Sequence, residues 1–152
     1  MCEGRSRSES TMDIEIRPYD TTDEGEVVSL WERCGLVVPW NDPHKDIQRK
    51  LRVQPELFLV GLLKDEIIAT AMAGYEGHRG WINYLAVHPD YQRSGFGRLM
   101  MKAVEARFKA MGCPKMHVQV RTSNRGVIDF YEAIGFVRDD VVSLGKRLEH
   151  DE

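Results

Sequence analysis

One segment constrains the fold of this chain more than any other. An apolar stretch, Leu85–Val87, is followed by a loop that carries two glycines and two arginines (92–98) and then by a long amphipathic stretch, from about Gly97 to Met111. Apolar residues recur at helical spacing in the long stretch, while the short one fits a buried strand. A strand, a tight loop and a helix in direct succession predict a sheet that carries helices.

The start of the predicted helix is a candidate anion site. The N–H groups of a helix's first turn lack partners within the helix, and together with the helix dipole they favour negative charge. Gly95 and Gly97 allow the backbone to approach a ligand closely, and Arg93 and Arg98 add positive charge. We expect a diphosphate here. A tight turn with no ligand is the alternative explanation of the two glycines when they are taken alone.

Two other phosphate-binding motifs do not match. Residues 95–100 lack the third glycine of the dinucleotide fingerprint, and their loop does not follow the first strand of a βαβ unit. No Gly-x-x-x-x-Gly-Lys-Ser/Thr sequence occurs.

Charge and composition restrict the partners. Lys and Arg number 21 against 24 Asp and Glu, for a net charge of −3, so no nucleic-acid partner is expected. No stretch approaches the roughly 20 apolar residues that span a bilayer, and the N-terminus has no apolar signal segment, so no membrane partner is expected.

Three scattered cysteines predict no disulfide framework and a cytoplasmic location. His88 and His117 are not spaced as metal ligands, which predicts no metal site.

The other elements predict one domain. Residues 1–11 are expected to form a flexible tail and residues 12–149 the domain. Periodicity and capping residues predict strands at 14–17, 57–63, 67–73, 81–87 and 116–120, helices at 21–34, from 43, 97–111 and 124–134, and a final hairpin made of Phe136 onward and Val141–Leu148. This order predicts an α+β (mixed α/β) fold, with a mixed, mostly antiparallel sheet and helices on both faces.

Two spaced motifs carry a resemblance to a known family. Gln92-x-x-Gly95-x-Gly97, after the strand end Leu85-x-Val87-x-Pro89, resembles the acetyl-CoA-binding motif of the GNAT superfamily of N-acetyltransferases. The later block Asn124-x-x-Val127-x-x-Phe130-Tyr131-x-x-x-Gly135-Phe136 resembles that family's Asn-x-x-Ala-x-x-Phe-Tyr-x-x-x-Gly-Phe block. The order of elements is similar too, so the resemblance covers nearly all of the chain after Met12. Within the superfamily the chain resembles small bacterial YpeA-type acetyltransferases, through residues 30–34, 39–43, 77–80 and 143–148.

The resemblance implies acetyl-CoA as co-substrate and no metal. In the family, the strand before the glycine loop separates from its neighbour and binds the pantetheine arm through its backbone, and the loop binds the pyrophosphate. The cofactor-binding residues implied here are Leu85, Ala86, Val87, Gln92, Arg93, Ser94, Gly95, Phe96, Gly97, Arg98, Asn124 and Tyr131. Asn124 also suits a helix N-cap, and both roles are compatible.

The resemblance implies a catalytic role for Tyr131, which matches the tyrosine that protonates the departing thiolate of coenzyme A. A phenol with a pKa of about 10 can supply that proton; a buried core tyrosine is the alternative. The general base is less defined, because many relatives place a glutamate where this chain has Asn83. Glu76 is the nearest replacement, with His78 behind it, and an exposed hairpin acid is the alternative reading of Glu76.

The implied activity is transfer of an acetyl group to a primary amine, which is a small molecule, an amino acid or a protein amine. Candidate acceptor-binding residues are Trp40, Asn41, His44 and Arg79; Arg79 suits a substrate carboxylate, although surface arginines are common. A binding module or sensor for acetyl-CoA with little or no turnover is the alternative, because of Asn83. Relatives often dimerise through their C-terminal strands, which leaves a homodimer open.

Overall fold

The computed structural model describes residues 14–151, so the predicted tail at 1–11 lies outside the described residues. The described elements, apart from short 3₁₀ turns, are β1 (Glu15–Pro18), α2 (Glu24–Arg33), α3 (Pro43–Lys50), β2 (Phe58–Leu63), β3 (Glu66–Tyr75), β4 (Gly80–Val87), α4 (Phe96–Ala110), β5 (Met116–Val118) and α5 (Arg125–Ala133). The predicted order of elements is confirmed as far as α5.

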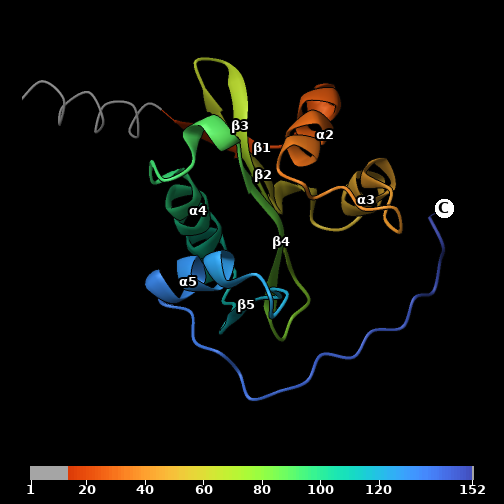
Figure 1. The fold of residues 1–152 in the computed structure, drawn as a ribbon, viewed down its shortest axis with the longest axis vertical. Helices are drawn as coiled ribbons and strands as arrows, with labels where there is room; N and C mark the ends of the chain where they lie inside the picture. Colours follow the sequence, from red (N-terminus) through yellow and green to blue (C-terminus); the bar gives the residue numbers. More distant parts are fainter. Residues whose placement is uncertain (1–13, 152) are drawn as a thin grey trace, which may run out of the picture.

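The strands form one open sheet in the order β1-β2-β3-β4-β5. The first three pairings are antiparallel, and the pairing of β4 with β5 is parallel. Helices α2 and α3 lie on one face of the sheet and α4 and α5 on the other (Figure 1). The predicted α+β fold is therefore confirmed.

Local sequence explains where the helices begin. Asp42 caps α3, because its side chain accepts hydrogen bonds from the backbone N–H groups of His44 and Lys45, and Pro43 occupies the first turn. Helix α4 begins instead at Gly95, whose φ of 87° is left-handed and which provides no side-chain cap. Its first N–H groups are therefore not satisfied by a capping side chain.

Each face of the sheet has its own apolar core. Buried residues of α2 and α3, among them Trp31 and Ile47, pack on one face, and Met100, Val104 and Phe108 of α4 pack on the other. A buried polar contact crosses the first layer. Thr70 Oγ1 accepts a hydrogen bond from Trp31 Nε1 at 2.9 Å and donates one to the carbonyl oxygen of Tyr84 at 2.8 Å.

We expect Thr70→Val to lower the free energy of unfolding by about 1–3 kcal/mol, because it leaves the buried Trp31 N–H and Tyr84 carbonyl groups without their partner. Urea unfolding followed by tryptophan fluorescence measures the change. Thr70→Ser, which keeps the hydroxyl group, is the matched control and should cost less. Equal stability of the Val variant and the wild type would contradict this role for Thr70.

The predicted final hairpin is wrong. No described residue after Ala133 belongs to a strand, and the segment 137–151 passes around the molecule as an extended chain (Figure 1). It meets β5 and the residues flanking it through side chains only, where Asp139 contacts Lys115 and His117 and Ser143 contacts Gln119. The edge that β5 offers is only three residues long, so a further strand has little backbone to pair with. Val142 and Leu144 are therefore left 83% and 91% exposed and cover no core.

Candidate active site

The sheet opens where β4 separates from β5. Their pairing ends at Ile82 and Val118, so the edge of β4 from Asn83 onward has no partner strand among the described residues. Just beyond that point Tyr84 has a left-handed φ of 51°, and the register between β3 and β4 shifts. Left-handed backbone is unfavourable for a tyrosine, and such strain is often found at functional sites. The separation creates a cavity of about 700 Å³.

The cavity is lined from both faces of the sheet. The lining residues of β4 are Ile82, Asn83, Tyr84 and Leu85; those from β5 to α5 are Val118, Gln119, Val120, Arg121, Asn124, Val127 and Tyr131; the others are Leu36, Asn41, Asp46, Arg49, Lys50 and Met72. Residues distant in sequence therefore meet around the free edge of β4, and the opening gives access to Tyr131 on one side and α3 on the other.

The glycine loop takes the conformation that its sequence predicts. Arg93 and Gly95 both have left-handed φ values, 64° and 87°, and the exposed side chains of Arg93 and Arg98 form no ion pair with any described residue. Phe96 is buried and anchors the loop to the core. An exposed loop of this shape, with backbone N–H groups and two guanidinium groups at a helix start, suits a diphosphate.

Gly97 lies in close packing. A Cβ atom at this position would lie 3.2 Å from Phe130 Cζ of α5 and 3.7 Å from Val87 Cγ2. The first turn of α4 therefore packs directly against α5 and the end of β4. The loop is further tied to β4 by Gln92, whose Nε2 donates a hydrogen bond to the carbonyl oxygen of Val87 at 3.0 Å.

Tyr131 lies at the inner end of the cavity. It is 8% exposed and packs edge-on against Phe130 and Phe136, each with a centroid separation of 5.2 Å. Burial raises the pKa of Tyr131 to about 12. The phenol therefore stays protonated at neutral pH, as a proton donor must.

The other cofactor-binding candidates differ in their access to the cavity. Leu85 and Asn124 line the cavity with Tyr131, and the Asn124 side chain also accepts the N–H of Val127 at 3.4 Å as the cap of α5. Ala86 is buried in the core beneath α2, so only its backbone is available to a ligand. Ser94 belongs to the exposed part of the glycine loop.

The four predicted acceptor residues do not come together. Asn41 lines the cavity. Trp40 lies beside it, with the guanidinium carbon of Arg121 5.8 Å from the centre of its ring. His44 instead pairs with Glu24 at 2.9 Å on the surface, and Arg79 lies in the turn between β3 and β4, where it bonds the carbonyl oxygen of His78.

Glu76 lies in the same turn, away from the cavity lining. Its Oε1 accepts the backbone N–H groups of His78 and Arg79 at 2.5 and 2.6 Å. These bonds lower the pKa of the Glu76 carboxyl group, which makes it a weaker base. The exposed hairpin acid, the alternative reading of Glu76, agrees with this geometry.

The sequence did not indicate a polar group on α3. Tyr84 donates its hydroxyl proton to Asp46 Oδ2 at 2.6 Å, and Arg49 donates to Asp46 Oδ1 at 3.2 Å. Lys50 is buried beside them, and burial lowers its pKa. The spacing of these residues predicts an ordinary charged helix, because only the tertiary fold brings α3 to the opening in the sheet.

Among the described residues, no group of three or more His, Cys, Asp and Glu side chains could hold a metal ion. No described helix is both long and apolar enough to cross a bilayer.

Comparison with known proteins agrees with this geometry. The model of the Acetyltransferase (GNAT) family matches residues 24–136, which contain the glycine loop, the opening in the sheet and Tyr131. The chain belongs to the GNAT family. It is 46% identical over 139 residues to a protein named acetyltransferase from Yersinia pestis (strain Pestoides F), an alignment that covers 91% of this chain and 99% of the relative. As a GNAT protein with acetyltransferase relatives of this similarity, it is an acyltransferase.

Solved GNAT structures share the fold. The ribosomal-protein-S18-alanine N-acetyltransferase from Escherichia coli is 25% identical, with a TM-score of 0.68 over 80% of this chain and 76% of that one. The structure of AAC(6')-Iy, in complex with the bisubstrate analogue CoA-S-monomethyl-acetylneamine, gives a TM-score of 0.73 at 18% identity, over 88% of this chain and 98% of that one.

Proposed function

We propose that this GNAT enzyme transfers the acetyl group of acetyl-CoA directly to a primary amine. The observation that carries the proposal is the free edge of β4, which joins the glycine loop at one end and faces Tyr131 across the cavity. A pantetheine arm is an extended chain of amides, so it suits an edge whose backbone groups have no strand partner. The residues proposed to hold it are Leu85, Val87 and Asn124.

The glycine loop would bind the diphosphate of the same ligand. The exposed backbone from Arg93 to Arg98 supplies N–H donors at the start of α4, and Arg93 and Arg98 supply charge. This explains how a chain with a net charge of −3 would bind an anion, since the loop supplies positive charge locally.

The proposed reaction follows from the residues around the cavity. The neutral amine nitrogen attacks the thioester carbonyl carbon, the carbon–sulfur bond breaks, and Tyr131 donates its hydroxyl proton to the departing thiolate. Solvent then returns a proton to the phenolate. Backbone N–H groups at the opening of the sheet would polarise the carbonyl group.

We propose that the amine loses its proton to water in the cavity. Asn83 cannot act as a base, and Glu76 lies in the turn described above. Asp46 lines the cavity, but its two carboxylate oxygens already accept hydrogen bonds from Tyr84 and Arg49. Water can accept the proton that the nitrogen releases after its attack, so no further side chain is needed as a base. This requires that the acceptor amine is neutral when it binds.

An acceptor panel tests the proposal. Purified protein is mixed with acetyl-CoA and with small amines, amino acids and peptides in turn, and thiol release and acetylated product are measured. We expect turnover for at least one class of amine, with one acetyl group transferred per thiol released. Coenzyme A binding in calorimetry without turnover for any amine would favour the alternative, a binding module or sensor that retains Asn83 in place of an acid.

A further inference from the structure

The C-terminal segment of the chain ends on α3, beside the cavity. The carboxylate of Asp151 receives a two-pronged contact from Arg49, whose Nη2 lies 2.8 Å from Oδ1 and whose Nη1 lies 3.2 Å from Oδ2. The backbone N–H of Asp42, the cap of α3, donates to the same Oδ2 at 3.0 Å. The side chain of Asp151 is only 1% exposed, so these donors enclose the carboxylate.

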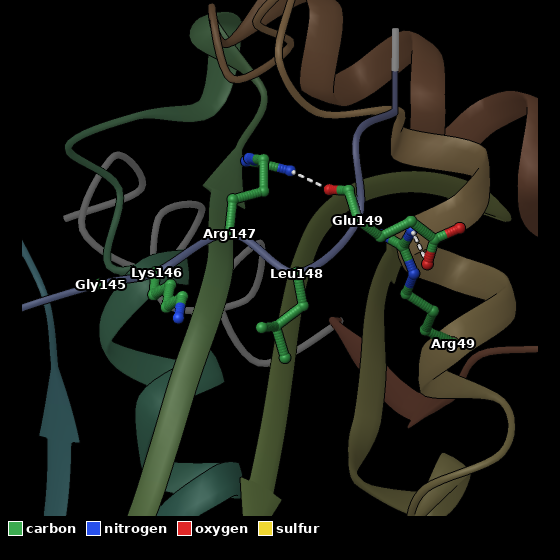
Figure 2. Close-up of a pocket in the computed structure, with 6 residues that line it drawn as sticks. All are labelled: Arg49, Gly145, Lys146, Arg147, Leu148 and Glu149. Carbon is green, nitrogen blue, oxygen red and sulfur yellow. Dashed lines mark hydrogen bonds and ion pairs between the residues drawn. The ribbon is translucent and has the colours of Figure 1, made fainter.

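The segment before Asp151 is fastened to the same region. Arg147 Nη2 donates to the side-chain oxygen of Asn41 at 2.9 Å, and Glu149 pairs with Arg49 at 3.3 Å. Residues 145–149 and Arg49 line a second, open hollow of about 620 Å³ (Figure 2). Arg49 and Asn41 also line the active-site cavity, so the end of the chain is attached to two residues on the α3 side of that cavity.

The carboxylate contact connects to the reaction site through side chains. Arg49 holds Asp151 with both Nη atoms while Nη1 also donates to Asp46, and Asp46 accepts the hydroxyl proton of Tyr84 at the opening of β4. A planar guanidinium group and a helix N–H form a fork that matches a carboxylate in shape as well as charge. This fork faces the side of the sheet opposite to Tyr131 and α5, the side from which an acceptor can approach.

We propose that Arg49 and the N–H of Asp42 form a carboxylate-binding subsite for the acceptor, and that Asp151 occupies it until an acidic amine displaces it. The inference rests on the proposed function and deepens it, because it names the acceptor class as amines that also carry a carboxylate. The C-terminal segment is then an internal competitor. It selects acceptors that replace its own contact with Arg49.

Matched acceptor pairs test the subsite in the full-length protein. Phenylalanine with 2-phenylethylamine, and leucine with 3-methylbutylamine, differ within each pair by the carboxylate, which the second member lacks. We expect the wild type to prefer the member with the α-carboxylate. Asp151→Asn should lower the KM of that member about tenfold, the effect of removing a competitor that occupies the site nine-tenths of the time, and should change the KM of its partner less than twofold. Asp140→Asn, in the exposed part of the same segment, is the charge-matched control.

A second readout does not depend on turnover. In the Asp151→Asn protein with coenzyme A present, the side-chain Nε–H NMR signal of Arg49, assigned by its loss in Arg49→Lys, should shift with N-acetylphenylalanine and not with N-acetyl-2-phenylethylamine. Equal KM changes within each pair, or an Arg49 signal that does not respond to the carboxylate, would overturn the subsite. Absence of turnover with every amine would overturn the proposed function instead, and the NMR titration would still decide the subsite.

Discussion

Tyr131→Phe is expected to lower kcat by about 10²- to 10⁴-fold, the usual contribution of a positioned general acid. The substitution removes one oxygen and leaves the aromatic packing against Phe130 and Phe136 in place. The dissociation constant of coenzyme A should change far less than kcat, because the other proposed cofactor contacts, to the diphosphate and the pantetheine, remain in place. Stopped-flow thiol release gives kcat, and calorimetry gives the affinity.

The pH dependence of the rate should also reflect the role of Tyr131 as a proton donor. Because burial raises the pKa of Tyr131 to about 12, the phenol keeps its proton throughout the range below that value. The rate should therefore rise with pH as the acceptor amine becomes neutral, with no fall caused by ionisation of Tyr131 up to at least about pH 10. A fall in rate above pH 8 that disappears in Tyr131→Phe would contradict the raised pKa.

Tyr19→Phe is the matched control for Tyr131. Tyr19 is also 8% exposed, stacks on an aromatic ring, and has its pKa raised to about 12 by burial, but it lies in the other layer of the core, outside the cavity lining. A comparable loss of kcat in both variants would mean that Tyr131 acts only through packing. A loss restricted to Tyr131→Phe supports the proton donor.

Gly97→Val is expected to weaken coenzyme A binding by at least about 100-fold. The new side chain meets Phe130 and Val87 at the first turn of α4, which displaces the N–H groups proposed to bind the diphosphate. Loss of two hydrogen bonds to a charged group, at about 1.5 kcal/mol each, corresponds to a change of that size. Isothermal titration with coenzyme A measures it directly.

A stability measurement must accompany the Gly97 variant, since the contact with Phe130 is also part of the core. Gly25→Val is the control, because Gly25 lies on the exposed face of α2 with no atom within 4 Å of an added Cβ. If Gly97→Val unfolds cooperatively and binds coenzyme A as tightly as the wild type, the glycine loop is only a tight turn, the alternative that the sequence left open.

Local patterns predicted most of the framework. Two adjacent residues, Asp42 and Pro43, indicate the start of α3. In the structure Asp42 is the N-cap and Pro43 lies in the first turn. The glycine loop was predicted in the same way, because positive φ and an open helix start depend on residues adjacent in sequence. The end of the chain differs, because Val141 to Leu148 look like strand residues but find only a three-residue edge beside them. Strand formation requires a partner that local sequence does not reveal.

In the site, too, the residues that local sequence predicted differ from those that only the tertiary fold brings together. Tyr131 and Asn124 were found because one motif contains both. Asp46 and Arg49 were missed because a charged pair on a short helix is typical of a solvated face, and nothing near them in sequence indicates the opening between β4 and β5. His44 and Arg79 were expected in the acceptor site, and the fold directs each to a different surface.

Only three residue pairs join β5 to β4, and this has a consequence for how the last third of the fold is held. Most of its attachment must come from side chains such as Phe130 and Tyr131 rather than from a backbone ladder. A ligand lying along the free edge of β4 would supply the missing ladder and brace α5 at the same time. At 100 times its dissociation constant, such a ligand adds about 2.7 kcal/mol against unfolding. The acyl donor would then serve this enzyme as a temporary strand of its sheet.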